Sequence, residues 1–198
     1  MTRACAVGAW LAVAAATLLI MLPAADAAKP TLKHQTDAVH ALLRAQHPTI
    51  TAARLRRIGP DVASILLEAA RKPDNDRAAA RATVLLVHFP SPASALLLRR
   101  KLADKAAPVR IRRMAGMALI GGQGVAALGD AQAMLQHSEA HLRDGAANAL
   151  GGVVHSRATR LLKRRLATES EAFVRETIGR SIQQHRAART RRQRSTPK

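Results

Sequence analysis

Apolar residues recur along the chain with the spacing of one helical face, most clearly in a nine-residue window that occurs three times. The window begins at residues 111, 142 and 174, so successive copies are 31 and 32 residues apart. Its first and ninth positions are aliphatic, its second is Arg, its fifth is Ala or Ile, and its eighth is small. Positions 1, 5 and 9 share one face of a helix, and repetition at this period predicts an α-solenoid.

Each window lies in the second helix of a predicted helix pair. Pro60 opens a first helix over 60–72, and the pattern continues through residues 76–89, 93–105, 108–120, 124–137, 139–150, 156–168 and 171–186. A fourth, weaker window at 76–84 lacks the first apolar residue. A shorter terminal pair precedes these helices, with a cap at Thr36 or Asp37 and with Arg54 at the apolar fifth position of its window.

Glycines punctuate the predicted helices. The pairs Gly121-Gly122 and Gly151-Gly152 are expected to end their helices, because glycine adopts the left-handed cap conformation. Gly129 falls in the middle of the segment 124–137, which is therefore expected to form a bent or short helix.

The repeated Val/Leu-Arg-x-x-Ala-x-x-Ala-Leu pattern, the pair length of roughly 30 residues and the glycine-containing turns resemble HEAT-like repeats, first associated with phycobilin lyases. The resemblance covers about residues 50–185 and is best at 139–151 and 171–182. It implies an all-α, right-handed superhelix of about four to five helix pairs, whose concave face binds other macromolecules. The predicted solenoid domain is residues 29–185.

The first 28 residues have the features of a secretory signal peptide. Arg3 precedes an apolar stretch, and Ala25-Asp26-Ala27 forms a cleavage site of small residues, so cleavage is expected after Ala27 or Ala28. The alternative is an uncleaved membrane anchor, because residues 4–25 are long enough to span a bilayer. The sequence therefore predicts a periplasmic or secreted protein, which contacts a membrane only if this segment is retained.

Charge limits the classes of partner. The net charge is +19, and removal of the leader leaves it unchanged because the leader carries one Arg and one Asp. Such a field attracts acidic proteins, nucleic acid or anionic lipid headgroups. A GC-rich coding sequence would also favour arginine over lysine without any selection for binding. The chain has no Tyr and two Phe, so platforms for base stacking are not expected.

The arginines at the second window position form a ladder, namely Arg77, Arg112, Arg143 and Arg175. One interpretation is an anion-binding stripe along one face. The other is structural, because Glu139 and Glu171 lie four residues before the last two arginines, in the order that favours an ion pair within a helix. The structural interpretation is preferred here.

Two basic triplets recur 64 residues apart and are candidates for a partner-binding or polyanion-binding surface. They are Arg99, Arg100 and Lys101, and Lys163, Arg164 and Arg165. The predicted first helix between them, residues 124–137, carries no Lys or Arg, so any stripe would be interrupted, and a merely solvated face is the alternative.

A basic tail follows the last repeat. Residues 186–198 contain six basic residues, no acidic residue and no apolar period, which predicts a disordered arm. Its candidate binding residues are Arg189, Arg191, Arg192 and Arg194. The alternative role is that of a solubilising tail.

No motif indicates catalysis, a cofactor or a metal site. The chain lacks Gly-x-Ser-x-Gly and a phosphate-binding loop, and its single Cys5 lies in the leader. His137, His141 and His155 could meet at a repeat junction as metal ligands, but are interpreted as surface histidines.

Three functions are compatible with these features. The favoured one is a monomeric, exported, non-enzymatic scaffold that binds a protein partner, expected to be acidic. The alternative is a binder of nucleic acid, anionic envelope polymer or lipid headgroups. An enzyme related to the phycobilin lyases or to the HEAT-like glycosylases is the least favoured, because neither setting requires export and a base-flipping site usually employs aromatic residues.

Overall fold

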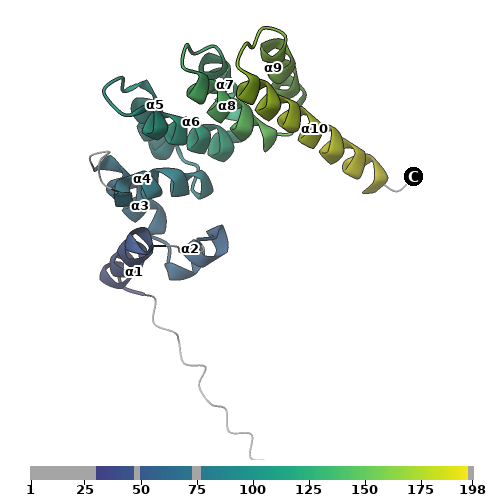
Figure 1. Cartoon of the computed structure of the whole chain (residues 1–198). Coiled ribbons are helices and arrows are strands. Elements are labelled where there is room, and N and C mark those ends of the chain that lie inside the picture. The colour runs from purple at the N-terminus through teal and green to yellow at the C-terminus, as the bar shows by residue number, and fades with distance from the viewer. Residues whose placement is uncertain (1–29, 47–49, 73–76, 196–198) are drawn as a thin grey trace, which may run out of the picture.

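The computed structural model describes residues 30–46, 50–72 and 77–195. Within these residues the chain forms helices joined by short turns, and no strand is present (Figure 1). The predicted signal segment lies outside the described residues. The all-α class expected from the sequence is therefore confirmed.

The helices follow one another closely along the chain. In order they are α1 (Leu32–Arg44), α2 (Ala52–Ile58), α3 (Val62–Arg71), α4 (Arg77–Leu85), η1 (Leu86–His88), α5 (Pro92–Ala103), α6 (Val109–Gln123), η2 (Gly124–Ala127), α7 (Leu128–Leu135), α8 (Ala140–Gly151), α9 (Ser156–Leu166) and α10 (Ala172–Ser195).

From α3 onward, consecutive helices pack in pairs: α3 with α4, α5 with α6, α7 with α8, and α9 with α10. The second helices also pack on one another in succession, from α4 through α6 and α8 to α10. The first helices lie along the other side, where α3 contacts α5 and α7 contacts α9 (Figure 1). Each apolar stripe is thus covered partly by its own pair and partly by the next pair.

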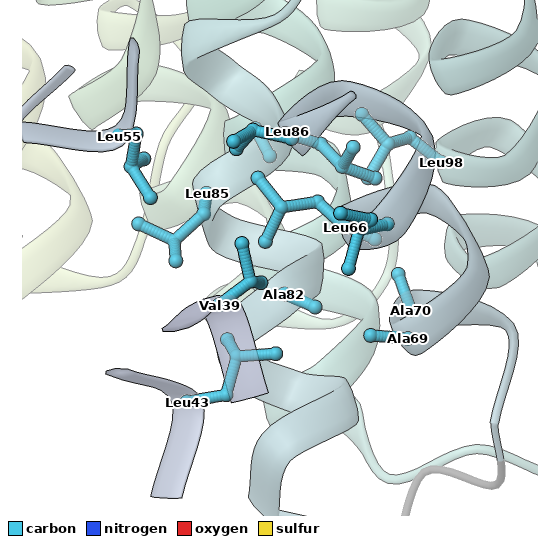
Figure 2. Close-up of a cluster of buried hydrophobic side chains, with 14 of the residues drawn as sticks. Val39, Leu43, Leu55, Leu66, Ala69, Ala70, Ala82, Leu85, Leu86 and Leu98 are labelled. Atoms are coloured by element: carbon cyan, nitrogen blue, oxygen red, sulfur yellow. The ribbon is translucent and has the colours of Figure 1, made fainter. Parts of the chain in front are cut away.

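The core is aliphatic and rich in alanine. One cluster of buried side chains is formed by residues of α1 to α6 and includes Leu66 and Leu86 (Figure 2). A second cluster begins at Ile120 in α6 and continues through α10. The fifth window positions Ala115 and Ala146 are fully buried, and their small side chains let neighbouring second helices approach closely. This agrees with the predicted helical faces.

The first helix begins earlier than the sequence predicts. Thr31, rather than Thr36 or Asp37, is its N-cap, and its hydroxyl accepts from the backbone N–H of His34 at 3.3 Å. In the short α2, Leu55 is buried and Arg54 is exposed. Arg54, at the fifth window position, therefore faces solvent, and the neighbouring Leu55 is the buried residue of this short helix.

The predictions for the two glycine pairs need correction. Helix α8 ends at Gly151 as predicted, but its C-cap Gly152 has φ −80° and is not left-handed. Helix α6 passes through Gly121 and Gly122 and ends at Gln123, with Gly124 at φ +57° as its C-cap. Gly122 lies against the backbone of Val87, because a Cβ atom there would be 3.2 Å from the Val87 carbonyl oxygen. A close approach between elements, rather than a helix end, therefore accounts for Gly122. The segment after Gly124 is a 3₁₀ turn followed by the short α7, which fits the expectation of a bent or short helix.

The structure differs from the prediction of a disordered arm. Helix α10 continues beyond the predicted boundary at residue 186 and ends at Ser195 (Figure 1). Residues 186–195 consist mainly of Arg, Ala and Gln, which are strong helix formers, and contain no Gly or Pro. A helix that has already begun on packed residues needs no new nucleus to extend through such a segment.

Candidate functional site

The four arginines of the ladder have different surroundings. Arg77 and Arg175 are exposed, whereas Arg112 and Arg143 are only 8% and 6% exposed. A continuous exposed anion-binding stripe along these positions is therefore absent from the structure, and the buried side chains of Arg112 and Arg143 make contacts within the fold.

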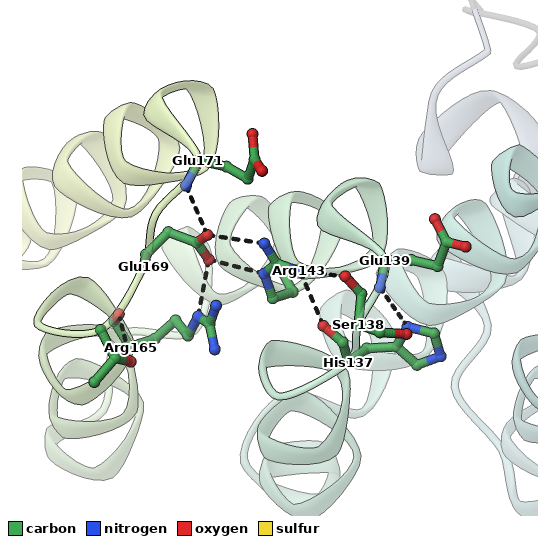
Figure 3. Close-up of polar contacts among 8 residues, drawn as sticks. His137, Ser138, Glu139, Arg143, Arg165, Glu169 and Glu171 are labelled. Carbon is green, nitrogen blue, oxygen red and sulfur yellow. Dashed lines mark hydrogen bonds and ion pairs between the residues drawn. The ribbon is translucent and has the colours of Figure 1, made fainter.

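Arg143 joins two consecutive helix pairs. Its Nε and Nη2 atoms donate to the two carboxylate oxygens of Glu169, each at 2.8 Å, and its Nη1 donates to the carbonyl oxygens of His137 and Ser138 (Figure 3). The Glu169 side chain is fully buried. The expected partner Glu139, four residues earlier, is not the one used. Arg143 instead pairs with a residue 26 positions later, in the turn before α10.

The Glu169 carboxylate is held by further donors. Arg165 donates from Nε at 2.8 Å, and the backbone N–H of Glu171 donates at 3.0 Å (Figure 3). Hydrogen bonding to Arg143, aided by these two donors, holds the pKa of Glu169 far below its usual range despite burial. The carboxylate is thus ionised at neutral pH and compensates the buried guanidinium charge.

Other arginines of the second helices bind the ends of first helices. Arg112 donates from Nε to the carbonyl oxygen of Leu102 at 3.1 Å, near the end of α5. Arg81 of α4 donates to the carbonyl oxygens of Leu43, Ala45 and Gln46 at the end of α1. Such carbonyls have no partner within their own helix, so the guanidinium groups act as C-terminal caps. Arg81 occupies the sixth window position, which is why the repeat pattern did not identify it.

The two basic triplets match in sequence but not in structure. Arg99 forms an ion pair with Asp130 of α7 at 2.9 Å, Arg100 is exposed, and Lys101 is buried. In the second triplet, Lys163 and Arg164 are exposed.

Arg165, the third member of that second triplet, is the residue that binds Glu169. Parts of both triplets therefore stabilise contacts between helices, and they do not present two equivalent basic patches.

The remaining tail candidates lie on the last part of α10. Arg189, Arg191, Arg192 and Arg194 are exposed. Arg189 donates to the hydroxyl of Thr159 in α9 at 3.4 Å, so this part of α10 lies beside α9.

Helix α9 adds further cations to the same end of the molecule. Its exposed residues include Arg157, Arg160, Lys163 and Arg164, and none of these forms an ion pair with a described residue. Residues 156–195 contain 12 Lys and Arg but three Asp and Glu.

We call the exposed cations of α9 and of residues 186–195 the C-terminal basic region; its members are Arg157, Arg160, Lys163, Arg164, Arg186, Arg189, Arg191, Arg192 and Arg194. The sequence analysis missed Arg157 and Arg160, although their spacing with Arg164 places all three on one helical face.

The three histidines considered as metal ligands have separate roles. His137 contacts Arg112, and His141 packs against Phe173 with ring centroids 5.5 Å apart. His155 caps α9 by accepting the backbone N–H of Arg157. Among the described residues, no three His, Cys, Asp or Glu side chains are grouped so that they could hold a metal ion.

A cavity of about 440 Å³ lies between α5 and α7. Its walls are mainly apolar, and the side chains of Arg112 and His137 line it. Three of its lining residues, Arg99, Arg112 and His137, were candidates in the sequence analysis, and the cavity itself was not predicted.

Comparison of the chain with models of known protein families and with curated proteins finds no match. The resemblance to HEAT-like repeats therefore rests on the residues quoted above. In the part of the chain that the structure covers, no helix combines the length and the apolar character needed to cross a lipid bilayer.

Proposed function

We propose that the protein is an exported, non-enzymatic scaffold of the HEAT-like α-solenoid type that binds an acidic protein partner. Two features support the solenoid: the sequence repeat of 31 and 32 residues, and the succession of second helices packed one on the next. The right-handed superhelix and the export belong to the same proposal and derive from the resemblance and from the leader sequence.

The observation that carries the proposed function is the C-terminal basic region. Arginines inside the fold are neutralised or bound to carbonyl groups, as Arg143 and Arg81 illustrate. The exposed cations of α9 have no such partner among the described residues. Like charges gathered on one surface repel each other, and a complementary acidic surface relieves that repulsion and accelerates association.

A protein partner is favoured because the α9 cations are held at fixed positions. Arg157, Arg160 and Arg164 project from one face of α9, and the buried Leu162 on the opposite face anchors the helix in the core. Carboxylates on a folded partner also have fixed positions, so the two sets can match in geometry as well as in charge.

The test is a pull-down from the exporting cell with the full chain and two matched variants. One variant replaces Arg157, Arg160, Lys163 and Arg164 by Gln, and the control replaces the exposed Lys33, Arg56, Arg57 and Arg100 by Gln. Both lose the same charge. We expect one stoichiometric acidic protein that the α9 variant loses and the control retains. Equal loss in both variants would show that net charge, rather than this surface, governs binding.

A polyanion is the second candidate, and one observation favours it. At 100° per residue, the arginines of residues 186–194 face all sides of α10 rather than a single face. An anionic polymer or lipid surface could contact such a helix in many orientations. Affinity for duplex DNA would then fall with salt, with a log-log slope of about 0.9 per phosphate neutralised, and truncation after His185 would lower that slope.

A further inference from the structure

Arg112 and His137 face each other, and the His137 ring has too few acceptor atoms for the N–H donors around it. The Arg112 Nη2 atom is 3.2 Å from His137 Nε2, and the backbone N–H of Glu139 donates to His137 Nδ1 at 3.0 Å. A neutral imidazole has one acceptor nitrogen, so the ring cannot accept from both donors. With Nδ1 accepting from the backbone, Nε2 carries a proton, and two N–H groups then point at one another.

The next helix pair shows what completes such a site. Arg143 stands 31 residues after Arg112, and its guanidinium is bound by Glu169. Glu169 also accepts from the backbone N–H two residues later, as His137 does. His137 therefore occupies the place of Glu169 in the preceding pair. A carboxylate is present at the later site and missing from the earlier one.

No carboxylate of the described residues replaces it. Arg112 is 8% exposed and forms no ion pair with any of them. Asp130 lines the same cavity, but Arg99 holds it with donors to both of its oxygens. A buried guanidinium without a counter-charge is costly, so the site favours an anion.

The cavity beside Arg112 determines what kind of anion fits. Its volume of about 440 Å³ lies in the range of small-molecule sites, and one acidic side chain of a partner would fill only part of it. Leu102, Ala133 and Met134 supply an apolar wall, and Lys105 adds positive charge. These surroundings suit a molecule with one charged end and one apolar end.

We propose that the cavity between α5 and α7 binds a small organic carboxylate that carries an apolar group. The carboxylate accepts hydrogen bonds from Arg112 and His137, and the apolar group lies against Leu102, Ala133 and Met134. This site is separate from the C-terminal basic region and does not depend on the proposed protein partner.

Octanoate is a suitable probe, with 1-octanol as the neutral molecule of equal chain length. Calorimetric titration of the full chain should show one octanoate site and at least about tenfold weaker binding of octanol, because a hydrogen bond to a charged group is worth a factor of this order. Arg112→Met should weaken octanoate by a similar factor, whereas Arg100→Met, on the exposed face of α5, should leave it unchanged.

A second variant separates loss of the site from loss of folding. His137→Glu places a carboxylate where Glu169 stands in the next pair. We expect a melting temperature raised by about 4 °C and no octanoate binding, because the side chain itself occupies the anion position. Equal affinity for octanoate and octanol, or octanoate binding that survives both variants, would overturn the proposal.

Failure of octanoate to bind would overturn the proposal as well. If His137→Glu weakened a protein complex under those conditions, the missing carboxylate would belong to an acidic side chain of that protein rather than to a small molecule.

Discussion

Arg143 and Arg112 occupy the same position in successive helix pairs, but their surroundings differ. Arg143 donates to both oxygens of a buried carboxylate and to two carbonyl groups. Arg112 donates to one carbonyl group and faces a histidine that is already an acceptor for a backbone N–H. The repeat thus places an arginine at each junction, meaning the contact between two successive helix pairs. It does not determine which residue binds that arginine.

The same position of the sequence repeat therefore has two different surroundings. At the later junction the buried charge is compensated within the chain, so the contact between α8 and the turn before α10 is closed. At the earlier junction the charge faces a cavity. The carboxylate ligand that we propose binds at this earlier junction.

The largest effect is expected where the two junctions are alike. Ala115→Asp and Ala146→Asp each place a charge at a fully buried fifth window position, and each should lower the free energy of unfolding by more than about 4 kcal/mol. Denaturant titration would measure this. Asn148→Asp adds the same charge to the exposed side of α8 and should change stability by less than about 0.5 kcal/mol. A tolerated Ala146→Asp would mean that the assigned helical face is incorrect.

The next largest effect is expected at Glu169. Glu169→Gln leaves the Arg143 guanidinium buried without its counter-charge, and should lower the free energy of unfolding by about 3–5 kcal/mol. Glu176→Gln removes an equal charge from the exposed side of α10 and serves as the matched control, with a change below about 0.5 kcal/mol. Similar losses in both variants would argue that overall charge is responsible.

Acid should weaken the later junction selectively. The pKa of Glu169 is lower in the folded protein than its ordinary value of 4.5. As the pH falls, the unfolded chain therefore binds the proton first, so the stabilisation is complete at neutral pH and declines below about pH 4.5. Unfolding measured from about pH 3 to pH 7 should show this decline in the parent and a shallower one in Glu169→Gln. Parallel profiles would contradict the assignment to Glu169.

A smaller effect is expected at the earlier junction. Arg112→Met loses the hydrogen bond to Leu102 but also removes an uncompensated buried charge, so the free energy of unfolding should fall by only about 1 kcal/mol. Arg143→Met removes two of the donors to the buried Glu169 carboxylate, leaving Arg165 and a backbone N–H, and should cost about 3 kcal/mol. Thermal unfolding of the two variants side by side would distinguish the junctions, and equal losses would show that they are energetically alike.

The positions of helices could be predicted from the sequence, but several side-chain contacts between residues far apart in the chain could not. Apolar spacing located α3 and α8 to within about two residues, because a helix buries a periodic face whatever covers it. The second-position arginines were also identified. Glu169 was not, because it approaches Arg143 only after two helix pairs have packed together. Local spacing instead suggested Glu139, four residues before Arg143, because that prediction requires no knowledge of tertiary structure; Glu139 is the N-cap of α8.

The same limit explains the glycine and tail predictions. Gly122 is a close contact with η1, and nothing in its neighbourhood in the sequence distinguishes that role from a helix end. Residues 186–195 lack an apolar period, but they extend a helix already nucleated on buried Ile178 and Ile182. The cavity at Arg112 could not be located from the sequence, since its walls come from three separate helices and two turns.

A pair of double-mutant cycles, on Arg143 with Glu169 and on Arg112 with His137, tests the difference between the junctions most directly. Each cycle uses Met for Arg and Gln for the partner, and denaturant unfolding at neutral pH gives the coupling energy. We expect a coupling of about 2–3 kcal/mol between Arg143 and Glu169, and less than about 0.5 kcal/mol between Arg112 and His137. Equal couplings would show that His137 already satisfies Arg112, and that no carboxylate is missing from the earlier junction.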